Sequence, residues 1–369
     1  MWPALDVDAD MLYRDVGTLG KTNEIPPHGY AVQAQEGESK VMSYKILFSG
    51  FLFCIEFLAF VSLSCAASGS QKLKITYSSL TGAYAPFWIA VEEGLGRKYG
   101  LDLEAIYGGR TSADLILASG EAQYSAGAGF GTVQSYALGE KDRVLIASFA
   151  NTTGFSIYSK PQITKSANLR GKVIGSGRPG ALSDTLLRYV LKSRLSLDPT
   201  RDVKIVPLGE PPNILPALEK GVVDAAILAT PARWMARKMG FRELVDLDEL
   251  GVQFPYVGVT TLKATVKKSP DTTVKLVATL TDAIQVFKTN KEKSLLVMKK
   301  YLRGASDEIL GETYGYFSSR TQKFPYPSFE AIKTALDMLS DQYPQAKSVD
   351  PHEVSDLSFV KQVESSGSR

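Results

Sequence analysis

The residues best placed to hold a ligand are the glycines of the stretch SGEAQYSAGAGFGTVQSYALG. Gly127, Gly129 and Gly131 follow a predicted strand and precede a predicted helix, an arrangement in which backbone N–H groups can bind a phosphate. A dinucleotide fingerprint also requires glycine at the sixth position and an acid about twenty residues further on. The sequence has Thr132 and Phe149 at these positions. The run therefore fails the dinucleotide test, and no Gly-x4-Gly-Lys-Ser/Thr pattern offers a P-loop instead.

Two interpretations of this glycine run remain. It forms a tight turn that lets a helix pack on its strand, or it contacts a ligand as one of several turns of small residues. In an α/β sheet such turns lie at the carboxyl ends of strands and line the ligand crevice. Similar turns are SSLTGAYAP, YGGRTS, SGRPGALS, LGEPPN and LATPAR, to which Arg110, Arg178 and Arg233 add positive charge.

Cysteine and histidine are nearly absent, which excludes several kinds of catalytic site. The chain has two cysteines, Cys54 and Cys65, and two histidines, His28 and His352. Between residues 71 and 351 there is neither a thiol nor an imidazole. Zinc sites with these ligands, cysteine nucleophiles and Ser-His-Asp triads therefore cannot be built there. No metal site and no cofactor is predicted.

Length and charge favour a two-lobed globular body. The 369 residues are 44% hydrophobic and 10% aromatic, enough for a large core divided between two lobes. Lys and Arg total 42 against 39 for Asp and Glu, so the net charge is only +3. Without a strong field or basic runs, binding to nucleic acid is not predicted.

From Lys72 onward, apolar strand-like runs alternate with helical patterns, which is typical of an α/β fold with largely parallel sheets. A strand at 73–79 leads into a helix at 86–100, and this alternation is repeated along the chain. Residues 127–132 are expected to form a loop. The pattern becomes helical throughout 269–343.

Two stretches share one layout, LILASGEAQYSAGAGFGTVQSYALG and ALEKGVVDAAILATPARWMARKMG. Each contains a helix end, a glycine, a short strand, a turn of small residues, a short helix and a second glycine. This similarity predicts two lobes built from the same unit. The predicted boundaries place 72–160 and 255–369 in lobe one and 161–254 in lobe two.

The first seventy residues differ from the body. Residues 1–41 are polar and lack periodicity, which predicts disorder or a mis-annotated start, because Met42 would suit the start of a signal. In residues 42–67 a lysine precedes an apolar stretch and small residues follow, the layout of a secretory signal peptide. The alternatives are lipid attachment at Cys65, a buried helix, and an uncleaved membrane anchor, which Glu56 disfavours.

The body resembles the nitrate, sulfonate and taurine family of ABC-transporter solute-binding proteins, which includes proteins that bind the pyrimidine of thiamine. The resemblance extends from Leu73 to Gly367. It rests on blocks that occur in this order: APFWIAVEEGLGRKYGLDLE, YGGRTSADLILASGEAQYSAG, LRGKVIGSGRPGALSDTLLRYVL, LDPTRDVKIVPLG, ALEKGVVDAAILATP and FPYPSFEAIKTALD.

This resemblance implies a fold and a function. The fold would be the two-lobed α/β periplasmic-binding-protein (Venus-flytrap) fold, with two crossover strands, near 155–160 and 253–261, and C-terminal helices. The function would be to bind a small solute outside the cytoplasm, anionic like a sulfonate, nitrate or taurine, and to deliver it to a membrane permease. The protein would act as a monomer in the periplasm or another extracytoplasmic space, without catalysis.

The family's ligand-binding turns give the candidate binding residues. They match the loop after the first strand, two further turns of lobe one, and three turns of lobe two. The candidates are Ser79, Thr81, Tyr84, Gly109, Arg110, Thr111, Gly129, Phe130, Thr132, Arg178, Ser183, Asn213 and Thr230.

Three alternatives differ in function. A pyrimidine or other aromatic ligand would stack on aromatic residues, of which the candidates are Tyr84, Phe87, Trp88, Phe130 and Trp234. An enzyme resembling the thiamine-pyrimidine synthases would rely on a histidine and a cysteine-rich motif that have no counterpart in the body. An effector domain of a regulator would need a helix-turn-helix segment, which the N-terminus does not resemble.

Overall fold

The computed structural model describes residues 70–108, 113–127, 129–209 and 211–367. The chain divides into two units, Met1–Ala67 and Ser68–Arg369, and the second contains every described element. The predicted disordered segment and signal peptide lie outside the described residues. So do the candidate binding residues Gly109, Arg110 and Thr111.

The first sheet has five strands in the order β2-β1-β3-β10-β4. β1 is parallel to β2 and β3, whereas β10 is antiparallel to β3 and β4. In β1, apolar residues alternate in the sequence with Lys74 and Thr76, but Leu73, Ile75, Thr76 and Tyr77 are all buried, as expected for a strand inside a sheet that is covered on both faces. The bounds are β1 Gln71–Tyr77, β2 Leu101–Tyr107, β3 Tyr124–Gly127, β4 Arg143–Thr152 and β10 Gln253–Leu262.

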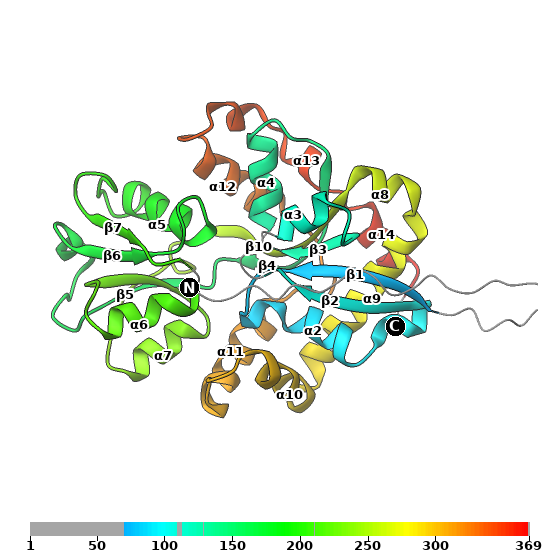
Figure 1. Cartoon of the computed structure of the whole chain (residues 1–369), viewed down its shortest axis with the longest axis horizontal. Helices are drawn as coiled ribbons and strands as arrows, with labels where there is room; N and C mark the ends of the chain where they lie inside the picture. The colour runs from blue at the N-terminus through cyan, green and yellow to red at the C-terminus, as the bar shows by residue number, and fades with distance from the viewer. Residues whose placement is uncertain (1–69, 109–112, 128, 210, 368–369) are drawn as a thin grey trace, which may run out of the picture. The chain divides into compact units, whose positions relative to one another are not determined.

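Short helices connect the strands of the first sheet and cover both of its faces. In Figure 1, α2 lies below the strands, and α3 and α4 lie above them. α2 carries proline in its first turn, where the missing N–H costs nothing. The helices are α2 Ala85–Glu92, α3 Ala113–Ala118 and α4 Gly129–Ala137, and two 3₁₀ turns are η1 Gly82–Tyr84 and η2 Leu95–Tyr99.

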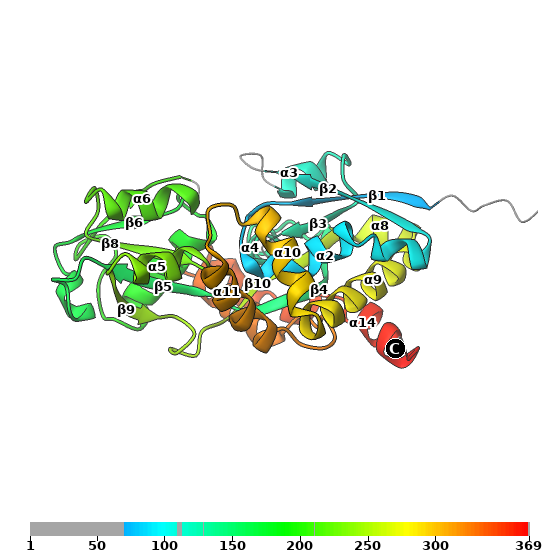
Figure 2. The same ribbon diagram turned by 90° about the horizontal axis from the view of Figure 1, so that it is seen from below.

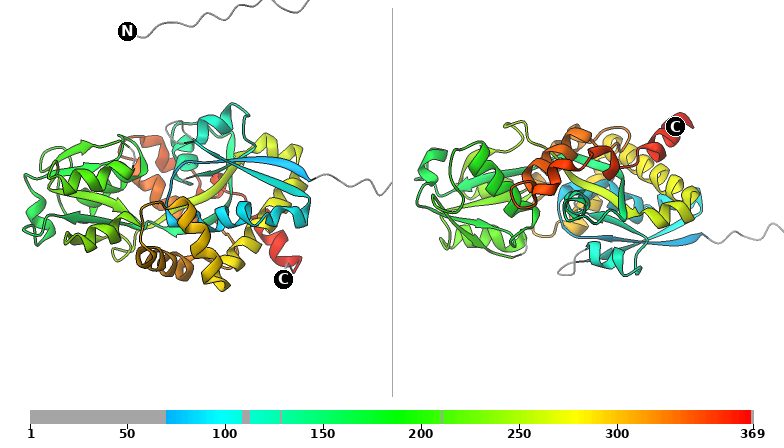
Figure 3. Two further views of the ribbon diagram at one scale, coloured as in Figure 1. Left: turned by 60° about the horizontal axis from the view of Figure 1, so that its bottom comes forward. Right: turned by 90° about the horizontal axis from the view of Figure 1, so that it is seen from above.

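The C-terminal third is helical, as predicted, and completes the first lobe. α9 packs against α2 and α14, and α12 packs against α4 and β10. Figure 2 shows α9 beside α2, and Figure 3 shows the C-terminal helices from two further sides. The bounds are α8 Lys263–Lys268, α9 Pro270–Thr289, α10 Lys291–Tyr301, α11 Asp307–Arg320, α12 Phe329–Leu339, α13 Pro351–Val354 and α14 Ser358–Ser365, with η5 Pro344–Ser348 between α12 and α13.

The second sheet has the order β7-β6-β8-β5-β9. β6 is parallel to β7 and β8, and β5 is antiparallel to β8 and β9. The elements are β5 Phe155–Ser159, η3 Ser166–Leu169, β6 Val173–Ser176, α5 Leu182–Ser193, β7 Lys204–Pro207, η4 Pro211–Asn213, α6 Ile214–Glu219, β8 Ala225–Ala229, α7 Ala232–Lys238 and β9 Arg242–Asp246.

The two sheets are built on the same plan. In each, three parallel strands stand in the order second, first, third, and an antiparallel strand follows the third. The paired stretches found in the sequence correspond to α3-β3-α4 and α6-β8-α7. A glycine with positive φ follows each of these four helices, at Gly120, Gly139, Gly221 and Gly240, where a left-handed residue ends the helix at no steric cost.

The boundary between the sheets differs from the predicted one. The strand β5, placed in lobe one by the predicted boundary at residue 160, pairs along its whole length with β8 and β9 of the second sheet. The long run from Arg143 to Ser159 is two strands interrupted at Thr153 and Gly154, and Gly154 has a positive φ of 62°. We therefore define the first lobe as 70–152 and 253–367, and the second as 155–246.

Candidate ligand-binding cleft

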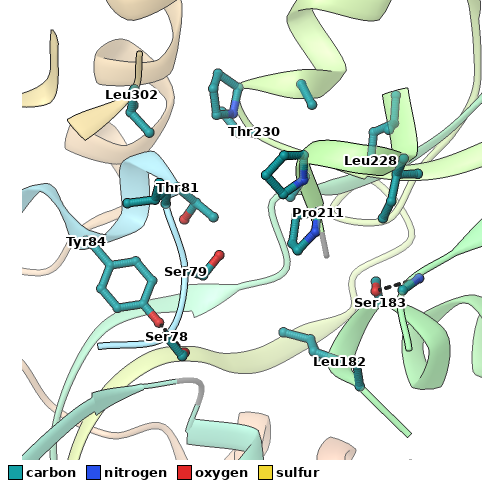
Figure 4. A pocket seen from close by; sticks show the side chains of 18 of the residues that line it. Ser78, Ser79, Thr81, Tyr84, Leu182, Ser183, Pro211, Leu228, Thr230 and Leu302 are labelled. Atoms are coloured by element: carbon teal, nitrogen blue, oxygen red, sulfur yellow. Dashed lines mark hydrogen bonds between the residues drawn. The ribbon is translucent and has the colours of Figure 1, made fainter. Parts of the chain in front are cut away.

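A cavity of about 1010 Å³ is lined by residues of both lobes. This volume is at the upper end of the range for small-molecule pockets, roughly 300–1,000 Å³. Figure 4 shows Ser79 and Thr81 of the first lobe facing it, with Pro211, Leu228 and Thr230 of the second lobe on the other side. We call this cavity the cleft.

The first-lobe wall of the cleft includes the loop that follows β1. Ser78, Ser79 and Thr81 of this loop and Tyr84 of η1 carry hydroxyl groups and line the cleft. The Tyr84 and Ser78 hydroxyls are 3.2 Å apart and hydrogen-bonded. The loop can approach α11 because residue 82 is glycine: a Cβ there would lie 2.3 Å from Cγ2 of Thr313.

Tyr256 of β10 also lines the cleft and was not predicted from the sequence. Its ring packs edge-on against Phe155 and stacks on Phe317, at centroid distances of 5.5 and 6.5 Å. Burial raises the pKa of its hydroxyl well above the ordinary value, although the nearby Thr81 hydroxyl opposes this shift. Tyr256 therefore stays protonated and can donate a hydrogen bond.

The second-lobe wall of the cleft is mostly apolar. Its two polar hydroxyls already have partners: Ser183 accepts a hydrogen bond from the Gly177 N–H at 3.2 Å, and Thr230 donates one to the Gly154 carbonyl at 3.2 Å. The apolar members of this wall are Phe155, Ala181, Leu182, Pro211, Pro212, Ile214, Leu215, Pro216, Leu228, Ala229, Pro231, Ala232, Met235 and Met239.

The arginines that the sequence singled out have different roles. Arg178, in the turn after β6, is exposed and lines the cleft. Arg233 is 2% exposed and forms ion pairs with Glu243 and Asp246. Burial opposes its charge, but these two carboxylates outweigh burial and raise the pKa of Arg233. Arg233 therefore belongs to the interior of the second lobe.

Seven of the predicted binding residues line the cleft, namely Ser79, Thr81, Tyr84, Phe130, Arg178, Ser183 and Thr230. Three others make contacts within a lobe. The Thr132 hydroxyl is hydrogen-bonded to that of Thr260 at 2.6 Å, and the Asn213 side chain donates to the Leu208 carbonyl at 3.3 Å. The position of Gly129 is tight, because a Cβ would lie 2.9 Å from the Pro255 carbonyl oxygen.

The glycine run of the sequence lies both at the cleft and at a close packing contact. Gly127 and Gly131 line the cleft, whereas Gly129 lets α4 pack closely on β10. The expectation of a loop at 127–132 was wrong in part, because α4 begins at Gly129 and already includes Gly131 and Thr132. The tertiary contact with β10 stabilises helical geometry that the glycines alone disfavour.

A pair of crossing segments joins the lobes at 153–154 and 247–252. Asp248 of the second segment accepts hydrogen bonds from the backbone N–H of Thr153 at 3.0 Å and from its hydroxyl at 2.8 Å. It also accepts a hydrogen bond from the hydroxyl of Tyr316 in α11. One carboxylate therefore ties both crossings to the first lobe.

Asp248→Ala is expected to lower the free energy of unfolding by about 1–3 kcal/mol, because it leaves the buried N–H of Thr153 without an acceptor. Asp248→Asn keeps one acceptor oxygen and should cost less. Urea unfolding monitored by circular dichroism measures both effects. Glu249→Ala, at the neighbouring exposed position, is the control. If Asp248→Ala lowers the free energy of unfolding no more than this control does, the role of Asp248 is contradicted.

Ion pairs link the lobes in addition to the crossings. Arg237 of α7 bonds both carboxylate oxygens of Glu312 in α11 at 2.7 Å, and Lys238 pairs with Glu308 of the same helix. These pairs are exposed, and each is worth at most about 1 kcal/mol. They therefore link the lobes only weakly.

Ionisable groups at one end of the cleft neutralise each other. Lys300 donates to both carboxylate oxygens of Glu92, at 2.8 and 2.6 Å, and Tyr301 donates to one of them at 2.6 Å. Burial opposes ionisation of Glu92, but these hydrogen bonds outweigh it and lower its pKa. Among the described residues, no group of three or more His, Cys, Asp or Glu side chains is placed to hold a metal ion.

Comparison with known proteins identifies the family of the sequence. The model of the NMT1-like family matches residues 66–299. Among curated proteins, none matches the chain.

Solved structures share the fold. The periplasmic aliphatic sulphonate binding protein SsuA from Escherichia coli is 17% identical, with 78% of this chain and 92% of that chain covered and a TM-score of 0.64. The alkanesulfonate-binding protein SsuA from Xanthomonas axonopodis pv. citri, bound to MOPS, is 18% identical over 79% of this chain and 97% of that one, with a TM-score of 0.60. The desulfurization enzyme DSZB is 18% identical, with 80% and 99% covered and a TM-score of 0.60. The chain therefore has the periplasmic-binding-protein fold.

Proposed function

This chain belongs to the NMT1-like family, and we propose that it is an extracytoplasmic solute-binding protein of an ABC importer. It binds a small solute between its lobes and delivers it to a membrane permease. The observation that carries this proposal is the cleft, which residues of both lobes line. SsuA proteins, by their names, bind sulfonates with the same fold.

The arrangement gives binding a mechanism. A solute that touches residues of both lobes, such as Thr81 and Leu228, makes contacts that are complete only when the lobes are closed. Because a ligand shifts an equilibrium only by its difference in affinity for the two states, such a solute stabilises the closed form. The permease then distinguishes the loaded protein from the empty one.

We propose an anionic solute, with Arg178 as the residue of the second lobe that supplies charge to the cleft. The aromatic alternative has less support from the structure. Phe87 and Trp88 are buried in the core, and Trp234 lies beneath Arg233, whose guanidinium carbon is 4.2 Å from the ring centroid. Only Tyr84 and Phe130 of the predicted stacking residues line the cleft.

Export is proposed from the segment 42–67, which lies outside the described residues. Cleavage after the small residues at its end, or lipid attachment at Cys65, would leave the two lobes outside the cytoplasm. Within residues 70–367, as far as they are described, no helix has both the length and the apolar character needed to cross a bilayer. We further propose that the protein acts as a monomer.

An enzyme of the same fold is the second candidate, because DSZB, a desulfurization enzyme by its name, has a similar structure. Against it, the sequence from residue 71 to residue 351 contains no cysteine and no histidine. The charged side chains Glu92 and Lys300 of the cleft are paired with each other. We therefore propose binding and release of an unchanged solute.

Arg178→Ala is expected to weaken binding of an anionic solute about tenfold or more, because a charge-assisted hydrogen bond contributes about 1.5–3 kcal/mol. The melting temperature should stay the same, since the side chain is exposed. Calorimetric titration measures the affinity, and Arg194→Ala, an exposed arginine of the second lobe outside the cleft lining, is the control. Equal affinities for the two variants would remove Arg178 from the site.

A thermal-shift screen tests the function as a whole. The purified protein is heated with sulfonates, taurine, nitrate, bicarbonate and pyrimidines, since a ligand that binds only the folded state raises the melting temperature. At least one class is expected to do so. A flat response to every class at millimolar concentration would contradict the proposed function.

A further inference from the structure

The two walls of the cleft differ in chemistry. The second-lobe wall offers leucine, proline and methionine side chains beside the charged Arg178 and Glu219. Its Ser183 hydroxyl is bonded within the lobe, and its Thr230 hydroxyl is bonded to the adjoining crossing segment. The first-lobe wall also has apolar members, such as Leu80 and Phe130, but it adds several hydroxyl groups, from the loop after β1 and from β10. A solute that satisfied both walls would have a polar end and an apolar body.

Two first-lobe hydroxyls are buried but incompletely satisfied. Thr81 and Tyr256 are 4% and 5% exposed, and both line the cleft. Within the described part of the chain, neither side-chain oxygen has a hydrogen-bond partner of good geometry, although the two hydroxyls lie close enough for Thr81 to lower the pKa of Tyr256. Two buried hydroxyls that share at most one poor hydrogen bond are incompletely satisfied, and this cost persists in the free protein. A ligand that accepts hydrogen bonds would remove it.

Local structure keeps these hydroxyls in place. Thr81 precedes η1, and its side chain does not cap that turn. Gly82, pressed against Thr313 and Phe317, fixes the loop. Tyr256 is held by ring contacts with Phe155 and Phe317. Because these contacts position both hydroxyls before binding, the entropic cost of ordering them around a matching acceptor is small.

We infer that the cleft takes an organic acid with a bulky apolar body, whose acidic oxygens accept hydrogen bonds from Thr81 and Tyr256. The body lies against Leu182, Leu228 and Met235 of the second lobe. This inference rests on the proposed function and names the class of solute. Discrimination follows from apolar area, because binding strengthens with the apolar area removed from water, and a compact anion offers almost none to the second-lobe wall.

Two probes with one head group test the apolar part. Naphthalene-2-sulfonate and methanesulfonate carry the same sulfonate and differ in the body. Calorimetric titration of the intact protein is expected to give an affinity about 100-fold higher for naphthalene-2-sulfonate, in line with the area it buries. Equal affinities, or tighter binding of methanesulfonate, would overturn the inference.

Two variants test the hydroxyl anchor. Tyr256→Phe and Thr81→Val each remove the hydroxyl with little change of shape, and each should weaken naphthalene-2-sulfonate binding about tenfold. The free variants should melt no lower than the original protein, because each loses an incompletely satisfied buried oxygen. Tyr158→Phe is the matched control: among the described residues its buried hydroxyl also has no hydrogen-bond partner of good geometry, but it lies outside the cleft lining.

The outcomes separate this inference from the proposed function. If naphthalene-2-sulfonate binds equally to Tyr256→Phe, Thr81→Val and Tyr158→Phe, the hydroxyl anchor is refuted while solute binding stands. If methanesulfonate, taurine or nitrate binds but naphthalene-2-sulfonate does not, the apolar class is refuted and the proposed function again stands. If no member of the thermal-shift panel and neither sulfonate probe binds, both fail.

Discussion

Ala181→Trp is expected to reduce solute binding by about 100-fold or more, because an indole would occupy the space that the solute needs. Ala181 lines the cleft immediately before α5 and is only half-buried. Its φ of −70° and ψ of 161° suit any residue. The added ring can therefore extend into the open cleft without disturbing the core. Calorimetry with the best ligand of the thermal-shift panel measures the loss.

The control places the same ring outside the cleft. Ala118→Trp lies on α3 at an exposed position that is not part of the cleft lining, so binding should be unchanged. Both variants should show the far-UV circular dichroism of the original protein. Normal affinity of Ala181→Trp would mean that the solute binds elsewhere.

Arg233→Met is expected to lower the free energy of unfolding by about 2–3 kcal/mol. Removing one partner of a buried ion pair costs roughly 3–5 kcal/mol, because the remaining charge is left uncompensated. Here the partners reach solvent in part, since the Glu243 and Asp246 side chains are 32% and 17% exposed, which reduces the cost. Arg233 also lies over Trp234, at 4.2 Å from the ring centroid, a contact that methionine replaces incompletely.

Urea unfolding compares this variant with Arg237→Met, one turn further along α7. Arg237 pairs with Glu312 at the surface, and an exposed pair is worth about 1 kcal/mol at most. We expect Arg233→Met to lose clearly more free energy of unfolding than Arg237→Met. The dependence of this free energy on urea concentration should be similar for both variants. An equal or smaller loss at Arg233 would contradict its interior role.

Much of the fold could be predicted because local patterns agree with it. The alternation in β1 and the apolar stripe of α5 specify these elements directly, and glycines end the helices of both repeated units. The predicted resemblance to the nitrate, sulfonate and taurine solute-binding family is confirmed, as is the two-lobed fold. The division at residue 160 was misplaced because sequence alternation is the same whichever sheet a strand joins, and only pairing assigns β5 to the second sheet.

The site could be predicted in part. Turns after strands carry positional information, so the sequence pointed to residues such as Ser79, Thr81 and Arg178, which line the cleft. Tyr256 was missed because a tyrosine within an apolar strand has the pattern of a core residue, and only its contact with the Thr81 loop distinguishes it. The sequence also could not distinguish Arg178 from Arg233, because the ion pairs of Arg233 depend on carboxylates of β9 that approach α7 only in the folded lobe.

The measurement that tests the central claim most directly is titration of the purified protein with its ligand, followed by recovery of that ligand. Calorimetry gives the number of molecules bound, and chromatography with mass spectrometry identifies what is released on denaturation. If the protein is a solute carrier, each chain binds one molecule, and the same compound is recovered in full after prolonged incubation. Conversion of the ligand to a product, or the absence of saturable binding, would contradict the account.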